Sequence, residues 1–361
     1  MTTIHDLPTP ALLLDWPTAE RNIRFASDLV KDRDVRLRPH FKNHKCVEIA
    51  KRQLAAGGCV GMTAATVAEA RALLEGGVED VLIANQVSAP AKIRQLIEIA
   101  NKGVVRVAVD SRENAGPIAA AAREAGVEIG VLVEVDIGTK RCGLLPGEPA
   151  LRLARDLQDM PGIRFDGLQA YHGHVIGVQD VEERRKAARS TIQLAIDTRR
   201  LIESEGIECG ILSGMGSSTY RMVIDMEGVD ELQVGTYPTM DWYYNQLAPE
   251  FDIALSVLVS VISVFEDRFV LDVGVKGVAT EFGVPRFMGH PEFVIKRFVS
   301  EEHTIVPAEN HGMKVGDRLH MIPSHACGTC NLHNQIVVRD GEKVMDVWPI
   351  SARGYAVDPL P

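Results

Sequence analysis

The chain has 361 residues, 46% of them hydrophobic and 24% charged, and its formal net charge at pH 7 is −10. This length exceeds what a single core usually serves, so we expect two domains. The negative charge argues against a nucleic-acid partner, and no apolar run approaches the length of a membrane span. The first residues lack the pattern of a signal peptide, and the six scattered cysteines are typical of reduced thiols in the cytoplasm.

The first part of the chain alternates short β-rich runs with helical stretches. Residues 11–15 predict a strand, and the stretch from Trp16 to about Asp32 predicts a helix. Eight further strand-like runs lie at 35–42, 59–65, 80–86, 104–110, 130–136, 165–173, 209–216 and 231–238. Because each parallel crossover needs a helix, this rhythm predicts an α/β fold, a (β/α)8 TIM-type barrel over residues 16–248. A doubly wound open sheet is the alternative, but it usually carries a G-x-G-x-x-G turn that this sequence lacks after its first strand.

After Pro249 the sequence is dense in β signals and has little helix. The strand-like runs lie at 253–265, 268–274, 293–300, 303–309, 317–326, 334–340 and 343–351. Turn-forming residues separate these runs, which indicates antiparallel pairing. We therefore expect an antiparallel β domain formed by residues 249–361 together with residues 1–15.

The stretch VRLRPHFKNHK (35–45) carries the first candidate for chemistry. It reads as a strand that ends at Lys42, followed by an amphipathic helix from Lys45 to about Ala56. Function in such barrels gathers at the carboxyl ends of the strands, and a lysine amine held there can form a Schiff base with an aldehyde. A basic, solvated loop is the alternative.

Two turns rich in glycine and hydroxyl residues follow the seventh and eighth barrel strands, SGMGSSTY (213–220) and VGTYP (234–238). Loops in these positions recurrently bind phosphate through backbone N–H groups and hydroxyls. We therefore expect a phosphate-bearing ligand, against the alternative of two tight connecting turns. The loop EVDIGTKRCG (134–143) presents Arg141, whose guanidinium suits a phenolate-like oxygen; a surface arginine is the alternative.

The segment PSHACGTCNLH (323–333) holds the candidate metal ligands of the β domain. His325 and Cys327 are two positions apart, so on a strand both side chains would point to the same face. An imidazole and a thiolate together suit Zn²⁺ or a similar ion. Cys327-x-x-Cys330 would instead be half of a closed structural zinc site, but the sequence has no second pair of this kind. Two protein ligands completed by water describe an open metal site, and buried core side chains are the alternative.

In this order, RPHFKNHK, EVDIGTKRCG, YHGH, SGMGSSTY, LQVGTY and PSHACGTCNLH resemble the D-serine dehydratase and D-threonine aldolase family. The resemblance covers nearly the whole chain. It implies a pyridoxal 5′-phosphate (PLP) enzyme of fold type III, with an alanine-racemase-like barrel, a metal-binding β domain and a homodimeric assembly. The implied metal is divalent, zinc in the first place, with manganese or magnesium as alternatives.

The resemblance also implies roles for particular residues. Lys42 would bind the cofactor covalently and act in catalysis, Arg141 would meet the O3′ oxygen of PLP, and Tyr171 would line its ring. The two turns would hold the phosphate, at Ser213, Gly214, Gly216, Ser217, Gly235, Thr236 and Tyr237. His325 and Cys327 would bind the metal. The Lys42 amine is expected to converge with this metal pair on one small D-amino acid substrate.

The metal motif separates two reactions within that family. The aldolase branch typically has His-x-Asp, whereas the dehydratase branch, acting on D-serine or D-threo-3-hydroxyaspartate, has His-x-Cys, as here. We therefore predict a lyase that converts a D-β-hydroxy-α-amino acid into a 2-oxo acid and ammonia. The alternatives are retro-aldol cleavage to glycine and an aldehyde (D-threonine or 3-hydroxy-D-aspartate type), racemisation, and a PLP carrier without turnover. In the phosphate turn, Met215 stands where the family usually has glycine.

Overall fold

The structure is a computed structural model that describes residues 2–296 and 300–355. The chain forms two compact units. The barrel unit contains residues 27–42 and 50–235, and the β unit contains the described residues of 1–26, 43–49 and 236–361. These limits differ from the expected barrel limits of 16 and 248, because three segments cluster with the β unit instead: 16–26, 43–49 and 236–248.

The barrel unit is built on a sheet of eight parallel strands. In chain order they are β2 (Arg36–Leu37), β3 (Met62–Ala64), β4 (Asp80–Ile83), β5 (Val104–Val109), β6 (Ile129–Glu134), β7 (Ile163–Ala170), β8 (Ile211–Gly214) and β9 (Glu231–Leu232). Their spatial order is β2-β9-β8-β7-β6-β5-β4-β3. Parallel bridges from Leu37 to Cys59 and from His40 to Thr63 join the two end strands of this order. The predicted α/β barrel is therefore confirmed.

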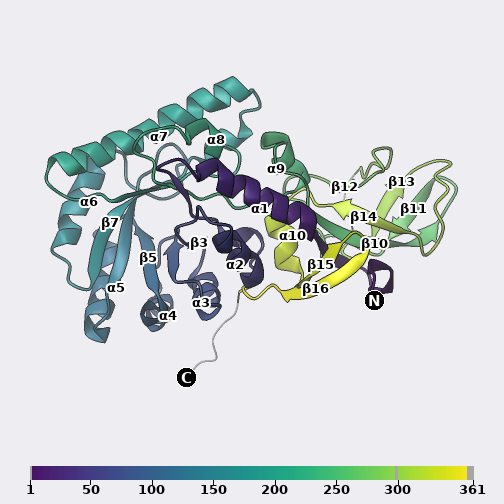
Figure 1. Cartoon of the computed structure of the whole chain (residues 1–361), viewed down its shortest axis with the longest axis horizontal. Helices are drawn as coiled ribbons and strands as arrows, with labels where there is room; N and C mark the ends of the chain where they lie inside the picture. Colours follow the sequence, from purple (N-terminus) through teal and green to yellow (C-terminus); the bar gives the residue numbers. More distant parts are fainter. Residues whose placement is uncertain (1, 297–299, 356–361) are drawn as a thin grey trace. The chain divides into compact units, whose positions relative to one another are not determined.

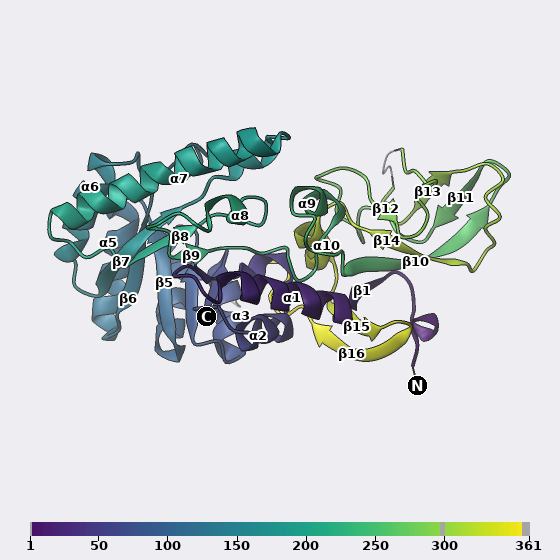
Figure 2. The same cartoon turned by 45° about the horizontal axis from the view of Figure 1, so that its top comes forward.

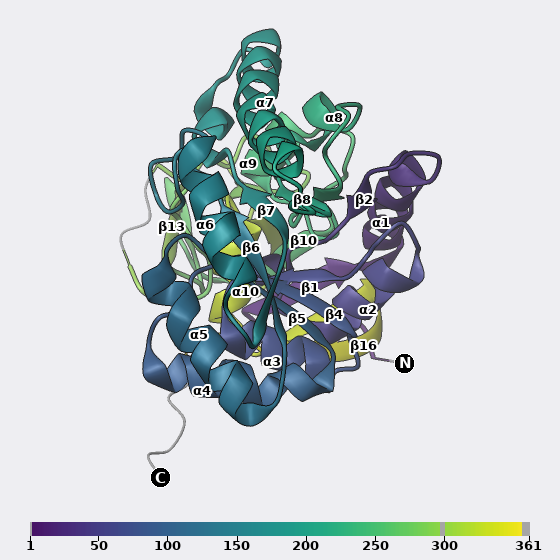
Figure 3. The ribbon, with the colours of Figure 1, turned by 90° about the vertical axis from the view of Figure 1, so that its left-hand side faces the viewer.

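Helices connect the parallel strands. They are α3 (Val67–Glu75), α4 (Pro90–Ile99), α5 (Arg112–Ala125), α6 (Glu148–Gln158), α7 (Val181–Ser204) and the short α8 (Tyr220–Val223), with 3-10 turns η2 (Phe41–Asn43), η3 (Ala100–Lys102) and η4 (Gly173–Gly177). Figures 1 and 3 show α3 to α7 on the outside of the strands. Strand β6 is buried along its whole length, as expected for a parallel strand covered on both faces. None of the described helices is long and apolar enough to cross a membrane.

The β unit is built on a second, largely antiparallel sheet. Its strands are β1 (Ala11–Asp15), β10 (Leu255–Val264), β11 (Arg268–Leu271), β12 (Arg286–Phe287), β13 (Thr304–Pro307), β14 (Arg318–Ile322), β15 (Gln335–Asp340) and β16 (Lys343–Pro349). The order is β12-β14-β10-β1-β15-β16, with β11 paired to β10 and β13 to β11; among the described strands of this second sheet, only the β1–β15 pair is parallel. Figure 2 shows β1, β15 and β16 side by side. The N-terminal strand thus belongs to this sheet.

The remaining helices are η1 (Ile4–Asp6), α1 (Trp16–Val30), α2 (Val47–Ala55), α9 (Trp242–Leu247) and α10 (Ala326–Leu332). The strand predicted at 293–300 differs from the structure, because residues 293–296 form no strand and 297–299 lie outside the described residues. The Phe293 ring instead packs edge-on against Phe269, with centroids 5.0 Å apart. The alternating apolar side chains of residues 293–296 thus reach the core although their backbone forms no strand. Strand β12, in contrast, was not predicted from the sequence.

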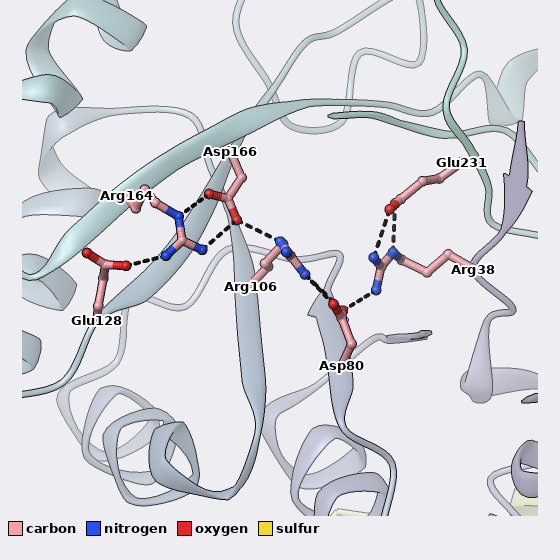
Figure 4. A network of polar contacts seen from close by, with 7 residues as sticks. All are labelled: Arg38, Asp80, Arg106, Glu128, Arg164, Asp166 and Glu231. Carbon is pink, nitrogen blue, oxygen red and sulfur yellow. Dashed lines mark hydrogen bonds and ion pairs between the residues drawn. The ribbon is translucent and has the colours of Figure 1, made fainter. Parts of the chain in front are cut away.

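Charged side chains form a network inside the barrel unit (Figure 4). Arg38 donates from Nε and Nη2 to the two carboxylate oxygens of Glu231, at 2.6 and 2.7 Å, and from Nη1 to Asp80 at 2.5 Å. Glu231 and Asp80 are the first residues of β9 and β4, so one guanidinium ties these strands to the segment leading to Lys42. Burial disfavours the charge on Arg38, but the two carboxylates outweigh this and raise its pKa.

Replacing Arg38 with methionine is expected to lower the free energy of unfolding by about 3–5 kcal/mol, because Glu231 would stay buried without its counter-charge. Arg164→Met is the matched control. Arg164 pairs with Asp166 in the same network, but its side chain is 51% exposed, so we expect a loss below about 1 kcal/mol. Urea unfolding of both variants measures the difference. Equal losses would show that burial does not set the cost of breaking this network.

Candidate functional site

Lys42 lies in the turn η2, beyond a strand β2 that is shorter than predicted. Its neighbours Phe41 and Asn43 are buried, at 0% and 1% exposure, whereas the Lys42 side chain is exposed. A hydrogen bond of 2.9 Å from the His40 N–H to the Val234 carbonyl oxygen holds the backbone before Lys42 to the segment that follows strand β9. The amine is therefore presented from a fixed backbone, which is what positioning of a reactive group requires.

Tyr171 and Arg141 lie beside Lys42 in the barrel unit. The Lys42 Nζ is 6.0 Å from the centre of the Tyr171 ring, and the Arg141 Cζ is 5.2 Å from the same centre. Tyr171 directly follows β7, and Arg141 belongs to the loop after β6, so the carboxyl ends of neighbouring strands supply both. The sequence analysis selected these three residues separately, and the structure brings them together around one aromatic ring.

The loop that carries Arg141 is held by its own polar contacts. The Gly143 N–H donates to Asp110 Oδ2 at 2.9 Å, and the Arg141 Nη2 lies 3.6 Å from Glu134 Oε1. Burial raises the pKa of Glu134, although Gln86 and Arg141 favour its charged form. The Arg141 side chain remains 53% exposed despite this pairing. Its guanidinium is thus tethered loosely and available to a negatively charged oxygen.

The turn after β8 contains the predicted phosphate ligands Gly216 and Ser217. The Ser217 hydroxyl accepts a hydrogen bond of 3.1 Å from the Gly235 N–H, which joins the two predicted phosphate turns within the barrel unit. A Cβ on Gly216 would lie 3.6 Å from the Tyr171 ring, so the turn approaches the same ring as the two cations. The Ser218 Oγ is buried and has no hydrogen-bond partner among the described residues. A buried hydroxyl of this kind suits an anionic ligand.

Ser213 and Gly214 belong to strand β8 and not to the turn. Ser213 is fully buried and accepts a hydrogen bond of 3.0 Å from Gln233 Nε2. A Cβ on Gly214 would lie 1.8 Å from the Ala170 carbonyl oxygen, so strand packing requires glycine there. Met215 has a φ of 66°, a left-handed conformation that glycine adopts most easily. Burial of its side chain, 1% exposed, offsets that backbone cost.

The other two predicted phosphate ligands, Thr236 and Tyr237, cluster with the β unit. Tyr237 is 1% exposed, and its ring centroid is 5.7 Å from that of Phe251. The Thr236 carbonyl oxygen accepts hydrogen bonds from the N–H groups of Thr239 and Met240. Within this unit the two residues begin a tightly bonded turn, and their role as phosphate ligands stays a prediction.

His172 links strand β7 to the turn after β8. Its Nε2 lies 2.7 Å from the Thr219 hydroxyl, and the ring is 1% exposed. Burial, with a smaller contribution from His174, lowers the pKa of His172 to about 4. The imidazole is therefore neutral at pH 7 and acts as a hydrogen-bonding group next to Tyr171.

This pKa predicts a pH dependence of stability. Below its ordinary pKa of 6.5, His172 binds a proton in the unfolded chain but not in the folded one, so protonation favours unfolding as the pH falls from 6.5 toward 4. Between pH 7 and pH 5 this amounts to about 2 kcal/mol. We expect His172→Gln to lose less stability over this interval than the unmodified chain, measured by urea unfolding at both pH values. His5→Gln, at an exposed position, is the control; identical pH dependence in all three proteins would contradict the assignment.

The predicted metal ligands, His325 and Cys327, lie at the start of α10, so the expectation that they share the face of a strand is wrong. His325 has extended backbone just before the helix, and Cys327 is in its first turn. The helix begins here because the fully buried Asp241 accepts a hydrogen bond of 2.8 Å from the Ala326 N–H. The N–H groups of a helix's first turn have no partner within the helix, and Asp241 supplies one for the first of them. Cys327 nevertheless lies close enough to His325 to raise the pKa of its imidazole.

Other side chains of the β unit surround this pair. Glu281 Oε1 lies 2.5 Å from His325 Nδ1, and Asn43 Nδ2 donates to Cys327 Sγ at 3.5 Å. Burial lowers the pKa of His325, but Cys327, Glu281 and Asp241 outweigh it and raise the pKa to about 9. No group of three or more His, Cys, Asp or Glu side chains suited to a metal occurs among the described residues. The available donor set is therefore an imidazole oriented by a carboxylate, beside one thiol.

Sequence reasoning missed several of these residues. Asn43 and Ser218 lie inside motifs that were singled out, so their place in RPHFKNHK and SGMGSST was the signal that could have found them. Asp241 and Glu281 carry no such signal. Each is a single acidic residue far along the chain from its partner, 85 and 44 positions away respectively.

The residues present fit both groups that the family resemblance implies, PLP and a divalent metal. Around the Tyr171 ring, the barrel unit offers an amine, a half-exposed guanidinium and a turn with a buried hydroxyl that has no hydrogen-bond partner in the described part of the chain, which suits an aromatic aldehyde carrying a phosphate. In the β unit, an imidazole and a nearby thiol are a donor set for zinc, and the carboxylate on the imidazole is the outer partner that such ligands usually have.

Comparison with known families matches nearly the whole chain. A family described as "Alanine racemase, N-terminal domain" matches residues 14–241, and one described as "Putative serine dehydratase domain" matches residues 254–339. D-threonine aldolase from Arthrobacter sp is 38% identical over 356 residues, which cover 96% of this chain and 93% of the relative.

Solved structures with the same fold include both kinds of lyase. D-threonine aldolase from Filomicrobium marinum superposes with a TM-score of 0.94 at 34% identity, covering 97% of each chain. D-threo-3-hydroxyaspartate dehydratase from Delftia sp. HT23 superposes with a TM-score of 0.89 at 26% identity, covering 98% of this chain and all of the other. A Cys→Ala mutant of such a dehydratase is in a metal-free form, and a His→Ala mutant two positions earlier has also been solved.

Proposed function

We propose that this chain, which belongs to the family of PLP enzymes that join an alanine racemase N-terminal domain to a serine dehydratase domain, is a metal-dependent lyase that dehydrates a D-β-hydroxy-α-amino acid. Lyase chemistry on D-hydroxyamino acids is common to the aldolase and dehydratase relatives. The expected products are a 2-oxo acid and ammonia. D-serine and D-threo-3-hydroxyaspartate are the proposed substrates.

The barrel unit supplies the groups for the step at the α-carbon. Lys42 Nζ would hold the cofactor covalently, and once the substrate amine replaces it, the same nitrogen would accept the α-proton. Arg141 would bind the phenolate-type oxygen of the cofactor, and Gly216, Ser217 and Ser218 would bind its phosphate. When bound, PLP would supply an electron sink for the negative charge that develops at the α-carbon.

The β unit supplies the groups for the step at the β-carbon. His325 and Cys327 would hold the metal, and Glu281 would keep the imidazole in the orientation for binding. When bound, the metal would supply positive charge to the β-hydroxyl, which leaves as water. Asn43 donates a hydrogen bond to Cys327 Sγ within the β unit and would help to orient that ligand.

The observation that carries dehydration over other outcomes is the thiol at Cys327. The family resemblance implies a carboxylate two positions after the metal histidine in the aldolases, whereas this chain has the Cys327 thiol at that position. The dehydratase structures support the same assignment, since loss of a cysteine two positions after a mutated histidine goes with a metal-free form.

Retro-aldol cleavage is the second candidate, and overall similarity favours it. The D-threonine aldolase from Arthrobacter sp and the 3-hydroxy-D-aspartate aldolase from Paracoccus denitrificans are 38% and 36% identical to this chain, against 29% for the Delftia dehydratase. In this reaction the bond between the α- and β-carbons breaks, and glycine and an aldehyde result. His325 and Cys327 would again hold the metal, which would supply positive charge to the β-hydroxyl while the proton of that hydroxyl is removed.

Product analysis on a panel of D-β-hydroxy amino acids decides between the two. D-serine, D-threonine and D-threo-3-hydroxyaspartate are each incubated with the PLP- and zinc-loaded enzyme, with the L-enantiomers as controls. A 2-oxo acid with an equal amount of ammonia supports dehydration, whereas glycine with an aldehyde establishes the aldolase. Formation of the enantiomer alone, or turnover that survives complete removal of metal by a chelator, would overturn the proposal of a metal-dependent lyase.

A further inference from the structure

Cys327 has a second neighbour of its own kind, Cys330, which the proposed function does not use. Both are free thiols, three positions apart on α10. Cys330 is fully buried, whereas Cys327 is partly exposed. Positions three apart on an α-helix share a face and have Cα atoms about 5 Å apart. That separation lies inside the range of about 4.4–6.8 Å found in disulfides.

Within the β unit, Cys327 is the cysteine that shares a helix with Cys330. Cys46, the third cysteine of this unit, is fully buried, as Cys330 is. An oxidant arriving from solvent therefore meets Cys327 first, and Cys330 is the thiol placed to react with the oxidised product.

The backbone of this turn is held by its neighbours, so a bond between the two sulfurs would have to close by rotation of the two side chains. A Cβ on Gly328, between the cysteines, would lie 2.3 Å from Glu281 Oε1 and 2.6 Å from the Ala279 Cβ. The Ala279 N–H also donates to the Thr329 hydroxyl at 3.2 Å. Turning the Cys327 sulfur toward Cys330 would take it away from its contacts with Asn43 and His325.

We propose that Cys327 and Cys330 form a reversible disulfide, and that this bond removes the Cys327 sulfur from the metal site and stops the lyase reaction. The disulfide itself is independent of the proposed function; its effect on turnover rests on that function. A hydroperoxide oxidises the Cys327 thiol to a sulfenic acid and is reduced, hydrogen peroxide giving one water. The Cys330 sulfur then attacks the Cys327 sulfur, forming the S–S bond and releasing a second water. A dithiol reductant reverses the reaction by exchange.

Peptide mapping tests the bond directly. The PLP- and zinc-loaded enzyme, freed of reductant, is treated with hydrogen peroxide, alkylated without reduction and digested with trypsin. Cys327 and Cys330 fall in one peptide, Leu319–Arg339, whereas Cys46 falls in another, Cys46–Lys51. We expect the first peptide to be two hydrogens lighter and unalkylated, and to recover both alkylation sites after treatment with dithiothreitol. A crosslink between the two peptides, or sulfinic acid at Cys327 in place of the disulfide, would overturn the proposal.

Two variants and a metal measurement complete the test. Cys330→Ala must lose the reversible product, whereas Cys59→Ser, which removes a partly buried thiol of the barrel unit, must form it as the unmodified chain does. Zinc retained after gel filtration is expected to fall at least tenfold on oxidation and to return, with turnover, after reduction and zinc addition. A disulfide that leaves bound zinc unchanged would overturn the switch. If the reduced, loaded enzyme shows no turnover, the proposed function is overturned instead. If it turns over normally but forms no disulfide on oxidation, this inference alone is overturned.

Discussion

Replacing Lys42 with methionine will abolish lyase turnover and the covalent attachment of PLP. Methionine keeps an unbranched apolar chain as far as Cε and removes the amine, so the buried neighbours Phe41 and Asn43 keep their packing. Because that nitrogen is proposed both to hold the cofactor and to accept the α-proton, we expect a loss of at least about a thousandfold in kcat. The visible absorbance of lysine-linked PLP and its fixation by borohydride measure the attachment, and product formation measures turnover.

Lys45→Met is the matched control for this experiment. Lys45 belongs to the same motif, but its Nζ donates a hydrogen bond of 2.9 Å to Asn331 Oδ1 in the β unit. We expect this variant to keep both the covalent linkage and turnover. Borohydride-fixed cofactor found on Lys45, with Lys42→Met still loaded and active, would remove Lys42 from its role.

The second large effect is expected for Cys327→Ala, which should release the metal and stop turnover while PLP remains bound. Removing an outer-shell partner of a metal ligand already costs about 10–100-fold in affinity, so loss of one of two protein ligands should cost more than about 100-fold. Metal content by mass spectrometry, PLP absorbance and product formation are measured on the same preparation. Because PLP absorbance reports the barrel unit independently, retained absorbance excludes general unfolding as the reason for lost activity.

Two further substitutions make this prediction specific to the ligand. Cys330→Ala removes a buried thiol that is not proposed to bind the metal, and under reducing conditions it should keep metal and turnover. Cys327→Asp replaces a soft ligand with a hard one, so metal binding should return with a preference moved from zinc toward manganese or magnesium. Full metal content in Cys327→Ala, or metal loss in Cys330→Ala, would contradict the assignment of His325 and Cys327 as the metal pair.

Periodicity was sufficient to predict the eight parallel strands, because each strand of a barrel is buried on both faces and reads as an apolar run between helical segments. The same pattern placed Lys42 and Arg141 at strand ends, whereas Tyr171 came from the family resemblance. Residues at the carboxyl ends of parallel strands converge by topology, whatever their separation in the chain. The two turns predicted to bind phosphate were placed in the same way, and the structure joins them through Ser217 and Gly235.

The segment PSHACGTCNLH (323–333) has a local structure that periodicity did not predict. PSHAC was read as a strand, because a spacing of two places His325 and Cys327 on one face of an extended chain. In the structure, Asp241 accepts the hydrogen bond from the Ala326 N–H and a helix begins there instead. An interaction between residues 85 positions apart thus decided the local conformation, and no pattern within the segment records it. The partner of the His325 ring, Glu281, lies 44 positions away along the chain, and periodicity cannot predict this pairing either.

Local patterns in the chain were enough to specify the barrel and to place Lys42 and Arg141 at strand ends, since such patterns specify strands and strand topology brings their ends together. The surroundings of the predicted metal ligands, the unit to which Thr236 and Tyr237 belong, and the buried charge network of Arg38 became known only from the folded chain. These features depend on hydrogen bonds and ion pairs between distant residues. Such contacts are chosen by the packed fold and leave no period in the chain.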